Sequence, residues 1–248
     1  MVGLDDVIEH VEVIVSTGYP GHYAGTALPE ALFGINERGW GKSPITWYRN
    51  NIVEELNMLD FDMGRAPGRT YRYYTGEPHF RFGYGLNPLT TFELENVAVI
   101  PRNCLDQNIV KRKIDSNHVG SCSDLIVSVN VTNKGTRAAD EVVTAYFVPL
   151  DIIKESEPAS KLREQLFDFE RIHLHSGESI EVSFLVQANK TLELADSFGK
   201  PITFPGRYKL RVSNGIEVVE RTVTMGNDGF FRVTNQILYQ AQQVHVDA

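Results

Sequence analysis

One short stretch of the sequence concentrates side chains that could do chemistry. Residues 68–86 read GRTYRYYTGEPHFRFGYGL and hold three arginines together with six tyrosine and phenylalanine rings. Aromatic faces can stack on sugar rings while guanidinium groups bind hydroxyls, which would make Tyr73 and Phe82 the stacking residues of a carbohydrate site. The alternative is a seam in which the rings join two layers of the protein and glycines supply the turns. Because each ring buries about 150–250 Å², we expect the seam.

Candidate metal ligands are few. His173 and His175 alternate along one predicted strand and therefore share a face, but no third ligand is evident. We interpret them as strand-surface residues rather than as a metal site. The acidic residues among the first twelve positions are interpreted as a solvated edge. The sequence analysis therefore assigns no catalytic residue and no metal or cofactor site to this chain.

The two cysteines, Cys104 and Cys122, lack the C-x-x-C spacing and cannot alone form a zinc site. They are either free buried thiols or one disulfide that closes a loop. We expect free thiols. If the pair were oxidised, the bond would stabilise the fold by about 3 kcal/mol on chain-entropy grounds.

Two sites match the acceptor pattern for N-linked glycosylation, at Asn130-Val131-Thr132 and at Asn189-Lys190-Thr191. Asn130 faces outward by the alternation of its strand. The start of the sequence is acidic, where a secretory signal would carry a basic segment followed by an apolar one. We therefore expect both asparagines to be unmodified, and we assign no location in the cell.

Composition limits the classes of function. The chain has 248 residues, 42% of them apolar and 23% charged, which is typical of a globular protein. Its net charge of -8 opposes a polyphosphate backbone, so we expect no nucleic-acid partner. No stretch approaches the roughly 20 consecutive apolar residues of a membrane span, and we expect no membrane association.

The first ninety residues have the pattern of an α/β layer. The apolar run Val11–Val15 predicts a buried strand, and residues 18–21 form a turn. Thr26 can cap a short helix over residues 27–33, which Gly34 is placed to end. Residues 43–48 resemble another strand. The order strand, helix, strand indicates part of an α/β sandwich, whose uncovered strand 11–15 would favour self-association through its edge.

From residue 91 the pattern changes to short strands with period-two alternation, separated by turn residues. In residues 125–132, valines alternate with polar residues, so one face is buried and one is wet. The sequence predicts an all-β, immunoglobulin-like sandwich over residues 91–225, after an α/β part and connector over 1–90 and before a tail over 226–248. The predicted strands cover residues 92–100, 125–132, 141–148, 166–174, 178–186, 207–213 and 216–224.

Several motifs in order resemble glycoside hydrolase family 3. The first ninety residues contain GYPG (18–21), LFG (32–34), PITWY (44–48) and PGRTYRYYTG (67–76), the last closest to the β-xylosidase and α-L-arabinofuranosidase branch. The later segments VSVNVTNKGTRAADEVVTAYFVP (127–149) and FPGRYKLRVSNG (204–215) resemble the fibronectin type III-like module that ends such enzymes. The resemblance covers about residues 8 to 224.

The resemblance implies a retaining glycosidase whose carboxylate nucleophile lies on an N-terminal barrel and whose acid/base lies earlier in the second domain. Retaining hydrolysis needs two carboxyl groups about 5–5.5 Å apart, and no stretch of this chain matches either family motif. The implied reaction of the parent enzyme is exo-hydrolysis of xylo-oligosaccharides or arabinosides without a metal or organic cofactor. We expect this chain alone to give structural support and to be inactive.

Two other functions stay open at this point. The chain could be a non-catalytic carbohydrate-binding module whose aromatic stretch holds xylan, in which case replacing Tyr73 or Phe82 would abolish sugar affinity. It could also be a scaffold that completes a separately encoded barrel. The expected partners are therefore the barrel and α/β domain of the parent enzyme and a xylo-oligosaccharide.

Overall fold

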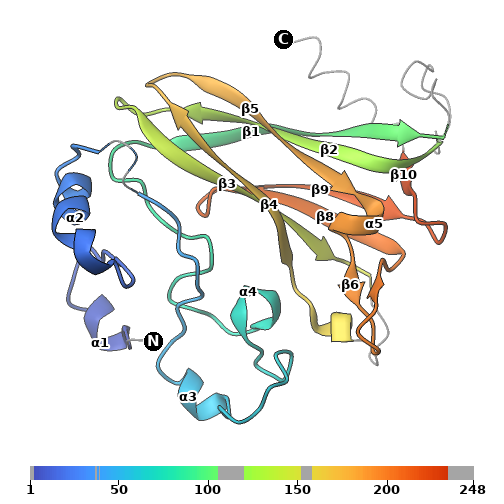
Figure 1. Cartoon of the computed structure of the whole chain (residues 1–248), viewed down its shortest axis with the longest axis horizontal. Helices are drawn as coiled ribbons and strands as arrows, with labels where there is room; N and C mark the ends of the chain where they lie inside the picture. Colours follow the sequence, from blue (N-terminus) through green and yellow to red (C-terminus); the bar gives the residue numbers. More distant parts are fainter. Residues whose placement is uncertain (1–2, 37, 39, 106–119, 152–157, 234–248) are drawn as a thin grey trace.

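The chain divides into a part made of short helices and long loops and a part made of strands (Figure 1). A computed structural model describes residues 3–36, 38, 40–105, 120–151 and 158–233. The helices and 3-10 helices are α1 (Asp5–Ile8), η1 (Gly21–Tyr23), α2 (Ala24–Leu32), α3 (Ile52–Glu55), α4 (Thr70–Tyr73), η3 (Pro158–Lys161) and α5 (Ala188–Thr191). The strands are β1 (Phe92–Cys104), β2 (Gly120–Asn133), β3 (Ala139–Pro149), β4 (Gln165–Leu174), β5 (Ser179–Gln187), β6 (Leu194–Ala195), β7 (Pro201–Ile202), β8 (Gly206–Ser213), β9 (Val218–Met225) and β10 (Phe231–Val233).

One antiparallel sheet contains most of the strands. Its order is β1-β2-β10-β9-β8-β3-β4, and β5 also pairs with β2. Strand β2 pairs with β1 on one edge, whereas its other edge is shared by β5, over residues 124–132, and by β10, over residues 120–122. The sheet therefore curls at β2, so that β1, β2 and β5 lie over the half formed by β3, β4, β8 and β9 (Figure 1).

The alternation of side chains along β2 explains which residues fill the inside of the curled sheet. Val127, Val129 and Val131 are fully buried, and their side chains share one face of the strand. They belong to a core that also contains Phe147 of β3 and Leu210 of β8. Apolar burial on the inner face of both halves holds the curled sheet together.

The prediction of an all-β region is confirmed in its coarser form, since the structure is mostly sheet with few helices and all seven predicted strands correspond to strands of the sheet. The strands form one curled sheet, and the immunoglobulin-like sandwich stays a prediction. The short elements β6, β7 and α5 were not predicted, nor was β10, which lies within the predicted tail and pairs with β2 and β9. Three residues are too few for alternation to be recognised. Residues 234–248 of the predicted tail lie outside the described residues.

The strand predictions for the first ninety residues are wrong. Val11–Val15 lies in a loop with exposed side chains, because no described strand offers it hydrogen-bond partners. Residues 43–48 contribute only an isolated bridge between Trp47 and Phe80. The predicted helix is present but extends over Ala24–Leu32, starting three residues before the predicted position.

Among the described residues, no helix is both long and apolar enough to cross a membrane.

The core makes a first test possible. Leu125 is fully buried on β2, whereas Leu185 on the neighbouring β5 is 42% exposed. Leu125→Ala should lower the free energy of unfolding by about 2–5 kcal/mol, since it leaves a cavity, and Leu185→Ala should change it by less than about 1 kcal/mol. Urea unfolding followed by circular dichroism measures both. Equal losses for the two variants would contradict the assignment of the inner face.

Candidate functional site

The aromatic stretch packs on the outer face of the sheet. Tyr71 and Phe82 are stacked with ring centroids 4.3 Å apart. The ring of Tyr146, on β3, meets both of them edge to face, at 6.0 and 6.5 Å. Its neighbour Phe147 points into the core. We call Tyr71, Phe82 and Tyr146 the aromatic seam, because they join residues 68–86 to the sheet as the sequence analysis expected.

Further ring pairs order the same stretch. Phe80 stacks on Tyr84 with centroids 5.3 Å apart, and Tyr74 meets Tyr48 edge to face at 4.7 Å. The turn Asn214-Gly215 between β8 and β9 also approaches closely, since a Cβ atom added at Gly215 would overlap the carbonyl oxygen of Gly83. A side chain at that position would therefore force the stretch away from the sheet.

Hydrogen bonds fix the register of the seam against the segment that leads into β4. The backbone nitrogen of Arg163 donates to the carbonyl oxygen of Arg72 at 2.8 Å, and its guanidinium group donates to that of Tyr74 at 2.6 Å. Arg72 in turn donates to the side-chain oxygen of Gln165 at 2.7 Å. These bonds add directional constraints to the ring contacts.

Ion pairs lie beside the seam. Arg211 of β8 forms ion pairs with Glu164 and, at 2.7 Å, with Glu220 of β9. Burial raises the pKa of Glu164, although Arg211 and Arg163 oppose the rise. Burial also raises the pKa of Tyr146 to about 12. We assign these groups to structure, because Arg211 pairs with both carboxylates and Lys209 also pairs with Glu220, at 2.8 Å.

A buried ion pair ties the loop before the aromatic stretch to β3. The Lys42 ammonium lies 2.8 Å from the Glu141 carboxylate, with side-chain exposures of 9% and 4%, and donates to the carbonyl oxygen of Gly85 at 2.7 Å. Burial raises the pKa of Glu141 even though Lys42 favours its charged form. A buried carboxylate without its cation would be strongly destabilising.

Asp140 holds a second junction between the two parts of the chain. Its carboxylate accepts hydrogen bonds from Arg171 and His173, each at 2.7 Å. Arg171 also donates to the carbonyl oxygens of Arg38 and Trp40. Burial raises the pKa of Asp140, but the two hydrogen bonds outweigh it and hold that pKa below its usual value.

The predicted residues can now be placed individually. The His173 ring lies 5.5 Å from that of His175, and no group of three or more metal-ligating side chains occurs among the described residues. Phe82 presents one ring face to Tyr71, and Tyr73 is half-buried against the core with Arg72 over its ring. Sugar stacking by Tyr73 and Phe82 stays a prediction.

The two asparagines of the glycosylation patterns lie in different settings. Asn130 is half-buried on β2, between Glu95 of β1 and Glu181 of β5. Asn189 is exposed on α5. The expectation that both asparagines are unmodified stays a prediction.

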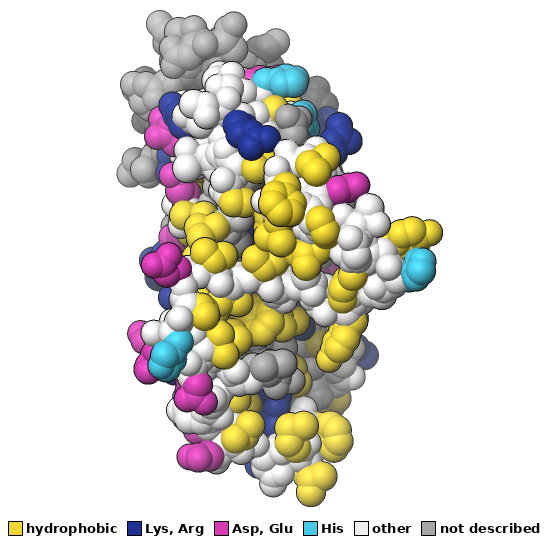
Figure 2. All heavy atoms as spheres, turned by 90° about the vertical axis from the view of Figure 1, so that its left-hand side faces the viewer, with side chains coloured by type: hydrophobic (Ala, Val, Ile, Leu, Met, Phe, Trp, Pro, Cys, Tyr) yellow, Lys and Arg dark blue, Asp and Glu magenta, His cyan; other side chains and the backbone are white. Residues whose placement is uncertain are grey.

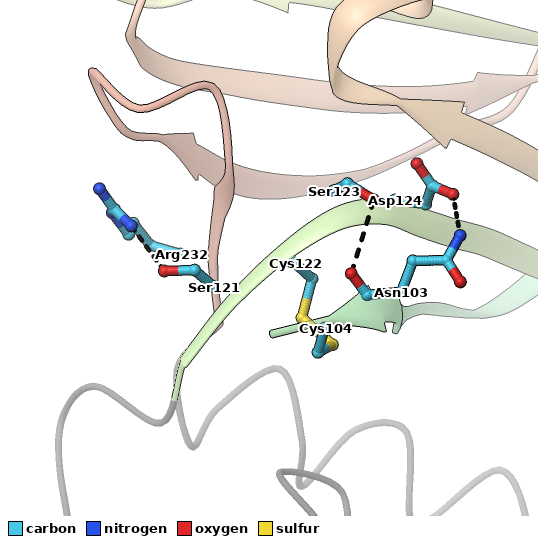
Figure 3. The surroundings of a disulfide bond; sticks show 7 residues. All are labelled: Asn103, Cys104, Ser121, Cys122, Ser123, Asp124 and Arg232. Carbon is cyan, nitrogen blue, oxygen red and sulfur yellow. Dashed lines mark hydrogen bonds between the residues drawn. A yellow bond between two sulfur atoms is a disulfide. The ribbon is translucent and has the colours of Figure 1, made fainter. Parts of the chain in front are cut away.

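The cysteines correct an expectation. Cys104, the last residue of β1, and Cys122 of β2 form a disulfide rather than free thiols (Figure 3). They are register partners in the antiparallel pair, so their side chains lie opposite each other. The predicted strands covered residues 92–100 and 125–132, so both cysteines lay outside them, whereas β1 extends to Cys104 and β2 begins at Gly120.

Tyr146 is a seam residue that the sequence analysis missed. It lies between the buried residues Ala145 and Phe147 of β3. A continuous apolar run in a strand indicates burial on both faces, so the run Ala145-Tyr146-Phe147-Val148 was the available signal.

The helical part leaves many apolar side chains uncovered. Figure 2 shows them gathered on the side of the molecule where α1 and α2 lie. We call the exposed side chains among residues 3–63 the apolar face, although they include positions along several loops. Its most exposed members are Val13, Tyr19, Tyr23, Phe33, Ile35, Val53, Met58, Leu59 and Phe61.

Lys42 offers a test of the junction. Lys42→Met should lower the free energy of unfolding by about 3–5 kcal/mol, because it leaves the Glu141 carboxylate buried and unpaired. Replacing both partners, in Lys42→Met/Glu141→Leu, should recover most of the loss. Arg65→Met is the matched control, since that side chain is 67% exposed in its pair with Asp60, and it should cost less than about 1 kcal/mol. The account fails here if Lys42→Met costs no more than the control.

Asp140 predicts a pH dependence. Its folded-state pKa lies below the unfolded value of about 3.9. Its stabilising contribution is therefore complete above that value and is lost as the pH falls through the folded-state pKa. Below about pH 5, the difference in unfolding free energy between the parent and Asp140→Asn should shrink as the pH falls. Asp168→Asn, at an exposed site on β4, is the control, and a difference that grows as the pH falls below about 5 would refute the assignment.

Comparison with known proteins agrees with the motifs. No family model matches the chain. It is 31% identical over 221 residues to β-D-xylosidase 1 of Arabidopsis thaliana, covering 82% of this chain and 28% of the relative. It is 28% identical over 217 residues to β-xylosidase/α-L-arabinofuranosidase 2 of Medicago sativa subsp. varia, covering 81% and 27%.

A solved structure supports the fold. The β-D-glucoside glucohydrolase of Trichoderma reesei matches 90% of this chain and 32% of its own with a TM-score of 0.66, at 19% identity. The chain spans little more than a quarter of the length of the curated relatives it matches. The chain is thus a relative of the C-terminal part of the β-xylosidases of glycoside hydrolase family 3.

Proposed function

We propose that this chain supplies the C-terminal, supporting part of a β-xylosidase-like glycosidase. In this proposal residues 1–90 complete an α/β sandwich domain and residues 91–225 form a fibronectin type III-like domain. The names of the curated relatives and the small share of their length that the chain matches support it. The parent reaction would be exo-hydrolysis of xylo-oligosaccharides or arabinosides.

The apolar face is the observation that carries the proposal. Phe33 is 81% exposed and Phe61 is 89% exposed, whereas the valines of β2 are fully buried in the same chain. Large clustered apolar surface on a folded protein indicates an interaction site. The occupant to which we commit is the remainder of the glycosidase fold, because about three quarters of each relative's length has no counterpart in this chain.

The paired carboxylates support the second half of the proposal, which is that the chain alone does not hydrolyse glycosides. A retaining glycosidase needs one carboxylate free to attack and one protonated carboxyl group beside it. Of the buried acids of the sheet, Asp140 and Glu141 instead face Arg171 and Lys42. Asp124 accepts a hydrogen bond from the Asn103 amide, and the half-buried Glu164, which directly precedes β4, faces Arg211. The catalytic pair would then lie on the remainder of the enzyme.

This part of the enzyme would contribute by holding its apolar face in a fixed orientation. The aromatic seam and the two ion-pair junctions hold the loops of residues 3–90 on the curled sheet. The sheet would thereby present the apolar face to the rest of the enzyme in a fixed orientation. Preorganised contacts of this kind reduce the entropy lost on assembly.

Self-association of the isolated chain tests the docking role. With its partner missing, the apolar face should bring copies of the chain together, and sedimentation velocity should show species larger than a monomer. Phe33→Ser/Phe61→Ser should shift the distribution toward the monomer, since it removes two of the most exposed rings. Phe198→Ser is the matched control, because Phe198 is 86% exposed but lies between β6 and β7. The proposal is contradicted if the control acts as strongly as the double variant, or if the parent chain is a monomer throughout.

A further inference from the structure

The disulfide lies at the point where the sheet curls. Cys122 has two register partners, Cys104 of β1 on one edge and Phe231 of β10 on the other, and Phe231 pairs in turn with Met225 of β9. This row of four residues is therefore where the half containing β1 and β2 continues into the half containing β8 and β9. Cys122 and Phe231 are both buried, at 0% and 1% exposure.

Strand β10 depends on a short template. Among the described residues its pairing with β2 involves residues 120–122, and β5 occupies the same edge from Asp124 onward. On its other edge β10 pairs with β9 through Phe231 and Arg232. The guanidinium group of Arg232 also donates to the side-chain oxygen of Ser121 at 2.6 Å (Figure 3). If residues 120–122 move, β10 loses its pairing with β2 and keeps its pairing with β9.

We call residues 120–122 the template. Among the described residues, few contacts besides the disulfide hold it on the side of β1. The backbone nitrogen of Leu105 donates to the carbonyl oxygen of Ser121 at 3.0 Å, and Asn103 donates to the Asp124 carboxylate (Figure 3). Leu105 is 72% exposed. Bonds at an exposed strand end open more readily than those of a core strand.

We propose that the Cys104–Cys122 disulfide is a thiol-reducible latch that keeps β10 on β2. When the disulfide is closed, it fixes residues 120–122 and therefore the place at which β10 pairs with β2. Open, it would release β10 from β2 and leave it attached to β9, while residues 124–132, which are paired with both β1 and β5, stay folded. Disulfides persist in oxidising compartments and are reduced elsewhere, so the latch would be closed in the former and open in the latter.

The opening step is a thiol–disulfide exchange with a dithiol. A thiolate of the dithiol attacks the sulfur of Cys104, which is the half-buried partner, while Cys122 is fully buried. The bond between the two cysteine sulfurs breaks, and Cys122 leaves as a thiolate that takes up a proton. The second thiol of the reagent then displaces Cys104 as a thiol. The dithiol is oxidised to a cyclic disulfide, and both cysteines are reduced.

Hydrogen exchange measured by mass spectrometry on the full chain, with and without dithiothreitol, tests the latch. Reduction should speed exchange at residues 120–122 and 231–233 by about tenfold or more, because the loop constraint is gone, and should leave residues 125–131 and 207–212 unchanged. Iodoacetamide labelling of Cys104 and Cys122 shows that both have been reduced.

A double variant controls for side effects of the reagent. Cys104→Ser/Cys122→Ser should show the fast exchange at β10 without dithiothreitol and no further change when it is added. Two results would overturn the proposal. In one, β10 stays as protected in the reduced chain as in the oxidised one. In the other, protection is lost over the whole sheet together, which would make the bond a support of the entire fold rather than a latch.

Discussion

The structure depends on which of its apolar side chains are buried by other parts of the chain. The curled sheet satisfies this constraint by itself, because the inner faces of its two halves bury one another's valine, leucine and phenylalanine side chains. Residues 3–63 do not satisfy it, since rings such as Phe33 and Phe61 remain in water. The sheet thus covers its own apolar surface, whereas the helical part leaves apolar side chains exposed.

The aromatic seam makes the two parts one body. Tyr146 belongs to β3, whereas Tyr71 and Phe82 belong to the stretch before the sheet, and their rings contact one another on the face opposite the core. The buried pair of Lys42 and Glu141 and the hydrogen bonds of Asp140 act at the same junction. Ring packing supplies area, and the charged groups supply register, because an unpaired buried charge costs more than a shifted ring.

The sequence predicted those elements whose burial is one-sided and regular. The alternation of valines in residues 125–132 defines the inner face of β2, and the structure buries all of them. The run Val11–Val15 failed as a strand because apolar composition does not supply hydrogen-bond partners. The disulfide was not expected because both cysteines lie in ends of β1 and β2 that extend beyond the predicted strands 92–100 and 125–132. The sequence predicted that the stretch 68–86 forms a seam, but it did not identify Tyr146. That residue can be assigned only when the strand whose outer face the stretch covers is known.

The central claim is that the carboxyl groups that break a glycosidic bond lie outside this chain. The most direct measurement is the release of nitrophenol from 4-nitrophenyl β-D-xyloside by the purified chain, followed over a range of substrate concentrations. The account predicts release indistinguishable from buffer at every concentration. Saturable turnover that is retained through purification and lost on heat denaturation would contradict it.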